Sequence, residues 1–102
     1  MSVAYIAGKI TGDRRAKQKF ARAARYVHQC GYDVVYDPAN MFPRGITGKE
    51  AMPICIRLID QADTVFFMPG WKDSRGANVE FAYCEYTEKE VQFLPAAEMM
   101  RI

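Results

Sequence analysis

The chain has 102 residues, 50% of them hydrophobic, and a formal net charge of +2. This length fits one domain that buries a core without disulfides or a structural metal. No stretch approaches the roughly 20 apolar residues of a membrane span. The first residues lack the basic flank and long apolar run of a signal peptide. We therefore expect one cytoplasmic domain over residues 1–102, without a cofactor or a metal.

The first half of the chain alternates strand and helix patterns. Residues 3–7 form an apolar run that ends at Gly8, which predicts a buried strand followed by a turn. Residues 13–29 then place apolar side chains on one stripe at helical spacing, with Asp13 as the expected cap. A second strand is predicted at residues 33–36.

The second half continues the alternation. Residues 38–48 predict a packed loop, which would either cover a pocket or seal a small core of its own. Thr47 and Glu50 have the spacing of a capping box, which predicts a helix over residues 47–61. The remaining predicted elements are an uninterrupted apolar strand at 64–68, a helix at 74–86 and a strand at 91–94.

This alternation predicts an α/β protein with one flavodoxin- or Rossmann-like three-layer domain around a mostly parallel sheet of four or five strands. In such sheets ligands bind outside the carboxyl ends of the strands. The loops at residues 8–13, 37–48 and 69–76 follow these ends and should converge on one rim.

The loop after the first strand has the composition of an anion-binding turn. Gly8 and Gly12, with Lys9 and Ile10 between them, stand just before a helix N-terminus, where free N–H groups attract anions. The spacing is not that of a P-loop. The glycines could equally be ordinary turn residues.

The loop before the third helix leads to a candidate catalytic carboxylate. Gly76 and Ala77 keep the helix start open, and Ser74 can cap it or contact an anion. Glu80 lies one turn further, on the apolar face that also carries Cys84. A carboxylate on such a face needs a partner or a chemical role.

Several roles are open for Glu80 from the residues alone. It could act as a nucleophile, as a general acid or base, or as an acceptor for sugar hydroxyls. A structural salt bridge with Arg75 or Lys9 is the alternative. The cysteines Cys30 and Cys55, like Cys84, are not in a CxxC pair, and we expect all three to be buried free thiols.

Three short stretches resemble the nucleoside 2-deoxyribosyltransferase-like superfamily, especially its small phage-associated members of unassigned function. They are YIAG at residues 5–8, ADTV at 62–65 and SRGANVE at 74–80, and the resemblance covers roughly residues 3 to 93. It implies that Glu80 attacks the anomeric carbon of a deoxyribose and releases the base, leaving a glycosyl-enzyme for water or a second base. Tyr5 would orient this glutamate.

The resemblance also indicates the substrate. Transferases of free nucleosides carry an Asp where Ser74 stands, whereas 2'-deoxynucleoside 5'-phosphate N-hydrolases carry a Ser. A hydroxyl tolerates a phosphate dianion better than a carboxylate does, because like charges repel. The implied substrate-binding residues are Gly8, Lys9, Ile10, Asp63, Ser74, Arg75, Gly76 and Ala77.

One position departs from the superfamily pattern. An Asp that positions the glutamate and protonates the base is expected eight residues before Asp63, and Cys55 stands there. A thiol is a poor substitute for a carboxyl group. We therefore retain two interpretations: an N-glycosidase or deoxyribosyltransferase-like enzyme acting on a (deoxy)nucleoside 5'-monophosphate through Glu80, and a nucleotide-binding protein that does not cleave its ligand.

Two expectations concern macromolecular partners. Superfamily pockets are often completed by a neighbouring subunit, and Trp71, Met41 and Phe42 offer apolar surface near the rim, so we expect a homo-oligomer. Nucleic acid is not favoured, because the basic residues of the first helix lack interleaved aromatics. These basic residues are Arg14, Arg15, Lys17, Lys19, Arg22 and Arg25.

Overall fold

The structure is a computed structural model of the chain and describes residues 1–99. Four parallel strands form one sheet in the order β2-β1-β3-β4. The strands are β1 (Val3–Ala7), β2 (Val34–Tyr36), β3 (Thr64–Phe67) and β4 (Glu90–Phe93). The helices are α1 (Ala16–Gln29), α2 (Gly48–Gln61), α3 (Arg75–Tyr86) and α4 (Ala96–Met99), with short 3-10 turns η1 (Pro38–Asn40) and η2 (Trp71–Asp73).

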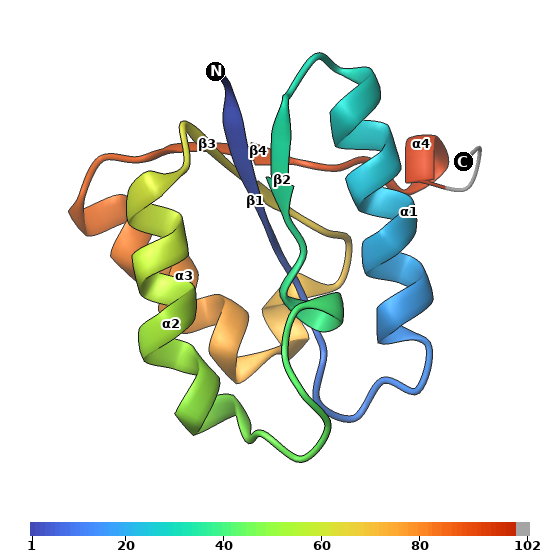
Figure 1. The fold of residues 1–102 in the computed structure, drawn as a ribbon, viewed down its shortest axis with the longest axis vertical. Coiled ribbons are helices and arrows are strands. Elements are labelled where there is room, and N and C mark those ends of the chain that lie inside the picture. Colours follow the sequence, from blue (N-terminus) through green and yellow to red (C-terminus); the bar gives the residue numbers. More distant parts are fainter. Residues whose placement is uncertain (100–102) are drawn as a thin grey trace.

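Helices cover both faces of the sheet, so the protein has three layers (Figure 1). Helices α2 and α3 lie on one face, and α1 and α4 lie on the other. Side chains alternate along β1: Ala4 and Ile6 pack toward α1, whereas Tyr5 and Ala7 pack toward α2 and α3. The predicted α/β three-layer class with a parallel sheet is confirmed. None of the helices in residues 1–99 is long and apolar enough to cross a membrane.

Most predicted elements form where the sequence places them, and the start of α1 is the largest difference. The helix begins at Ala16, not at residue 13. Asp13 does not cap it; instead its carboxylate accepts a hydrogen bond from the Arg15 N–H at 2.9 Å and forms an ion pair with Lys19. Asp13 thus stabilises a turn that precedes the helix.

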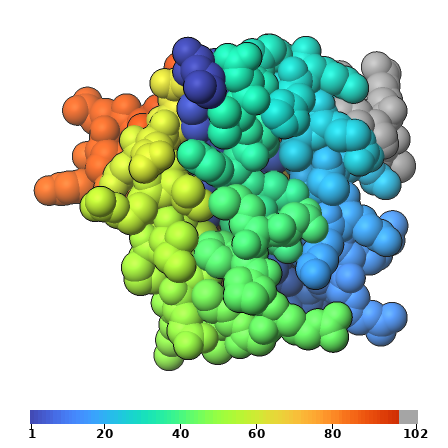
Figure 2. All heavy atoms as spheres, in the orientation of Figure 1, coloured from blue at the N-terminus to red at the C-terminus, as the bar shows by residue number. Residues whose placement is uncertain are grey.

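The first part of the segment between β2 and α2 packs against the core, with Pro38 and Ala39 buried, whereas most of residues 40–47 are exposed, so the expected packed loop is confined to its start. It contains η1, and the amide of Asn40 donates a hydrogen bond to the Lys17 carbonyl of α1 at 3.1 Å. The predicted capping box is present, because Thr47 accepts from the Glu50 N–H while the Glu50 carboxylate accepts from the Thr47 N–H. In the space-filling view, this green segment lies over the middle of the visible face, with α2 in yellow-green beside it (Figure 2).

Candidate functional site

Tyr5 and Glu80 form a buried pair between the sheet and helix α3. The alternation of β1 directs Tyr5 toward α2 and α3, and Glu80 lies on the buried face of α3 with Ala77 and Cys84. The Tyr5 hydroxyl donates a hydrogen bond to Glu80 Oε2 at 2.6 Å. Glu80 is only 5% exposed and Tyr5 is fully buried. The pair is therefore held away from bulk water.

Burial shifts the protonation of both groups. It raises the pKa of Glu80 to about 7, and the hydrogen bond from Tyr5 opposes that shift. The pKa of Tyr5 lies well above its ordinary value because of burial and because the Glu80 carboxylate is adjacent. Tyr5 thus remains a neutral donor, while Glu80 changes charge near neutral pH.

The structural salt bridge considered for Glu80 is not present. Within residues 1–99 the ion pair is Lys19–Asp13, and Glu80 is bonded to Tyr5 instead. Arg75 and Lys9 are both exposed, whereas Glu80 points inward from its helix. A partly ionised carboxyl without a cationic partner is costly to bury, which makes Glu80 a functional candidate.

Two thiols lie close to this pair. Cys55 on α2 is 6% exposed; burial raises its pKa, a contact with the Tyr5 hydroxyl lowers it, and the negative charge of Glu80 raises it further. Burial, with Glu80 nearby, raises the pKa of Cys84 to about 11. Both thiols are therefore neutral at physiological pH. Cys30 is exposed, so the expectation that all three cysteines are buried is wrong for this residue, which follows the last turn of α1.

The start of α3 lies between the loop after β3 and the buried pair. Ser74 caps the helix, with its hydroxyl accepting from the Ala77 N–H at 3.1 Å. The Asn78 amide donates to the Ser74 carbonyl at 2.7 Å and fixes this turn. Gly76 faces α2, where an added Cβ would lie 3.4 Å from the end of Met52. Arg75 is exposed at the helix start.

The loop after β1 reaches the same end of the sheet. Gly8 is buried, and a Cβ there would approach Met68 and Phe20 to between 3.1 and 3.2 Å. This glycine is thus required for close packing between the ends of β1 and β3 and helix α1. Lys9 and Ile10 continue the loop at the surface.

Asp63 is the predicted site residue that the structure places apart from the others. It precedes β3 at the amino ends of the strands, and its carboxylate accepts from the Val3 N–H at 2.8 Å. Tyr5 and Glu80 are in direct contact, and Ser74, Gly76 and Ala77 lie within the two turns before Glu80. Asp63 instead ties the starts of β1 and β3 together.

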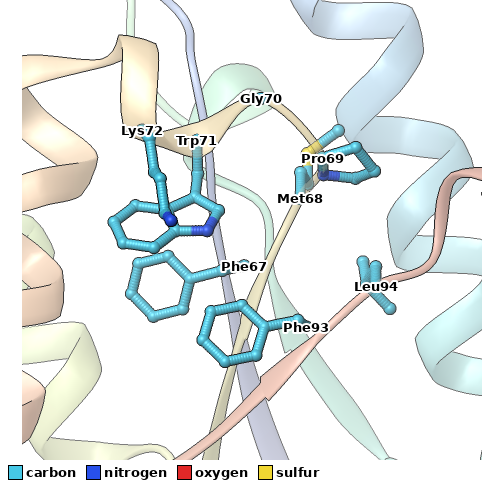
Figure 3. Close-up of a pocket in the computed structure, with 8 residues that line it drawn as sticks. All are labelled: Phe67, Met68, Pro69, Gly70, Trp71, Lys72, Phe93 and Leu94. Atoms are coloured by element: carbon cyan, nitrogen blue, oxygen red, sulfur yellow. The ribbon is translucent and has the colours of Figure 1, made fainter.

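A separate hollow of about 260 Å³ opens at the carboxyl ends of β3 and β4 (Figure 3). Rings of Phe67, Trp71 and Phe93 line one side of it, and Met68, Pro69 and Leu94 line the other. Neither Tyr5 nor Glu80 lines this hollow. Sequence reasoning missed this hollow, because the exposure of Phe93 follows from the position of β4 at the edge of the sheet, which short sequence patterns do not specify.

The structure defines a small parallel α/β protein with a carboxyl group buried between the sheet and helix α3. Residues 2–93 match a family described as "Domain of unknown function (DUF4406)". Because this match spans most of the chain, the protein belongs to that family. Comparison with curated proteins returned no match.

Proposed function

We propose that this protein binds a (deoxy)nucleoside 5'-monophosphate and cleaves its N-glycosidic bond through Glu80. The observation that carries the proposal is the hydrogen bond of 2.6 Å between Tyr5 and the buried Glu80, which lies in the second turn of a helix whose N-terminus is capped by Ser74. The resemblance of residues 74–80 to deoxyribosyltransferase-like proteins supports the choice of substrate.

In the proposed reaction, a Glu80 carboxylate oxygen attacks C1' of the sugar. The bond between C1' and the base nitrogen breaks, its electron pair leaves with the base, and the base takes a proton from solvent or from a donor in the site. Water then attacks C1' of the glycosyl ester, loses a proton, and regenerates the carboxylate. A second base in place of water gives transfer instead of hydrolysis.

The protonation of the pair suits this role. A nucleophilic carboxylate must be ionised, and a pKa of about 7 leaves a substantial ionised fraction at neutral pH. Tyr5 donates to one oxygen, Oε2, and so orients the carboxylate while the other oxygen attacks. Because Tyr5 keeps its proton, it does not compete with Glu80 as a base.

The phosphate of the substrate has a proposed place at the start of α3. The N–H groups of a helix N-terminus attract anions, and the exposed guanidinium of Arg75 adds positive charge beside them. The loop that contains Gly8, Lys9 and Ile10 ends at the same edge of the sheet and supplies a second cation. These groups would hold the phosphate while Glu80 faces the sugar.

Cys55 favours a second candidate function, nucleotide binding without cleavage. This buried thiol lies beside the Tyr5 hydroxyl, at the position where the resemblance implies an Asp that protonates the base. A neutral thiol with a raised pKa is a weak proton donor. The departing base would then lack its acid, and the site would retain its ligand intact.

Chromatography of free bases after incubation with a panel of deoxynucleoside 5'-monophosphates separates the two functions. Release by the native protein but not by Glu80→Gln supports cleavage, with Glu85→Gln as a control at an exposed glutamate of the same helix. Binding in calorimetry without release supports the second candidate. Neither binding nor release of any panel member would contradict both.

A further inference from the structure

The outer edge of β4 carries unpaired backbone groups. The sheet of the described residues ends at β4, which pairs with β3 alone. Phe67 lies opposite Phe93, and the Leu94 N–H donates to the Phe67 carbonyl at 2.9 Å. In a parallel sheet, each residue points its N–H and C=O to the same neighbouring strand, and successive residues alternate between the two sides. Leu94 points to β3, so Gln92 does as well. The N–H and C=O groups of Val91 and Phe93 therefore point outward.

Apolar side chains accompany this open edge. Phe93 is 57% exposed although it belongs to a cluster with the rings of Trp71, Phe81 and Phe67. The hollow in Figure 3 adjoins it and is lined mostly by apolar side chains. An exposed edge strand that also carries an apolar patch is a template for pairing with another chain.

We propose that two copies of the chain pair antiparallel through β4 and form one continuous eight-stranded sheet. A two-fold axis at Gln92 brings Val91 opposite the partner subunit's Phe93, and Phe93 opposite the partner subunit's Val91. These are the residues whose backbone groups point outward, so each such pair exchanges two hydrogen bonds. On the side of the sheet that α3 covers, this register places the side chain of Phe93 against that of the partner subunit's Val91. An aromatic side chain opposite a β-branched one is a favourable cross-strand pair.

The charges at the two ends of β4 are complementary in this arrangement. Exposed Glu88 and Glu90 lie at the start of the strand, and exposed Lys72 lies beside its end, with its ammonium 5.9 Å from the Trp71 ring. Antiparallel pairing brings each acidic start alongside the partner subunit's Lys72. An isologous interface requires such a self-complementary surface, which favours a second copy over an unrelated partner.

Sedimentation velocity of the native protein and of Val91→Pro tests the proposal. On the backbone, the proline removes an outward N–H and leaves the bonds between β4 and β3 in place, and prolines are tolerated at such edge positions. The change also replaces a half-buried side chain that packs against the core. We expect a dimer for the native protein and a loss of about tenfold or more in dimer affinity for the variant, because each copy loses one hydrogen bond. Tyr86→Glu, at an aromatic that is 88% exposed on α3, serves as the control and should leave the dimer intact.

A cross-link decides the question even where the proline variant fails to fold. The two-fold axis sets Gln92 against its own copy with Cα atoms about 4.5 Å apart, a distance that a disulfide spans. Gln92→Cys in a Cys30→Ser background should therefore oxidise to a covalent dimer, whereas Tyr86→Cys in the same background should not. A native monomer at every concentration, an unweakened Val91→Pro dimer or a Gln92→Cys variant that stays monomeric would overturn the proposal.

Discussion

The phenol of Tyr5 and the carboxyl group of Glu80 are 75 positions apart in the sequence and meet at 2.6 Å inside the protein. Strand β1 supplies the donor and helix α3 supplies the acceptor, so the contact exists only once the sheet and the helix have packed. Because Glu80 has no cationic partner among residues 1–99, its charge state depends on burial and on this one donor. Stability should therefore depend on the protonation of Glu80.

We predict that Glu80 destabilises the protein as the pH rises from about 4.5 to above 7. Its pKa is about 7 in the folded state and 4.5 ordinarily, so the folded state retains a proton that the unfolded chain releases. At about 1.4 kcal/mol per pKa unit, the free energy of unfolding should fall by about 3 kcal/mol over this range. Urea denaturation at a series of pH values measures the slope.

Two variants test the source of this dependence. Glu80→Gln keeps an acceptor for Tyr5 but cannot ionise, so its stability should change less with pH and exceed that of the native protein above pH 7. Glu50→Gln is the matched control. Hydrogen bonds from Thr47 lower the pKa of this exposed carboxyl, so its replacement should leave the fall in stability between about pH 4.5 and 7 in place. If the free energy of unfolding of Glu80→Gln falls with pH as steeply as that of the native protein, another group is responsible.

The sequence predicted the features that depend on residues close together in the chain. The capping box of Thr47 and Glu50 and the buried face of α3 with Glu80 both follow from spacing along one helix. The start of α1 was misplaced because Asp13 bonds to Arg15 in a turn, a competition between side-chain and helical hydrogen bonds that spacing does not show. Element boundaries depend on such single contacts.

Contacts between distant segments were less accessible from the sequence. The position of Asp63 beside the Val3 N–H follows from the register of β1 against β3, which a short motif does not specify. The pairing of Tyr5 with Glu80 was expected only through the resemblance to a superfamily, since periodicity gives the face of each element but not its partner. Phe93 was missed because exposure at a sheet edge depends on strand order.

Replacing Gly8 should destabilise the fold. A Cβ at this position would lie 3.1 Å from the Met68 sulfur and 3.2 Å from Phe20, closer than ordinary van der Waals contact. We expect Gly8→Ala to lower the free energy of unfolding by about 1–3 kcal/mol. Gly48→Ala is the control, because its new methyl group would meet nothing closer than 4.0 Å. Equal denaturation midpoints for the two variants would contradict this account of Gly8.

The proposed phosphate site predicts a preference for nucleotides over nucleosides. A charge-assisted hydrogen bond contributes about 1.5–3 kcal/mol, so calorimetry should show a deoxynucleoside monophosphate binding about tenfold or more tightly than its nucleoside. Arg75→Gln should reduce the difference in affinity between the nucleotide and the nucleoside, and added salt should reduce this difference too. Lys49→Gln, at an exposed lysine near the start of α2, should leave it unchanged. Equal affinities for nucleotide and nucleoside would reject the phosphate assignment.

The position of Cys55 predicts a gain of function. If the weak acidity of its thiol limits release of the base, Cys55→Asp should raise the rate of base release by about tenfold or more, within the range of general acid catalysis. Cys30→Asp places the same carboxyl group at an exposed site and should have no effect. Chromatographic rates for a correctly folded Cys55→Asp protein that match the native rate would argue against this role.

The most direct test of the Tyr5–Glu80 site is an NMR titration of the isotope-labelled protein with deoxynucleoside 5'-monophosphates. This measurement detects binding whether or not the bond is cleaved. The account predicts that the largest shifts fall on the Glu80 carboxyl, the Tyr5 ring and the amides that follow Ser74 at the start of α3. Spectra that do not change with any nucleotide of the panel, or shifts confined to the hollow beside Phe93, would contradict it.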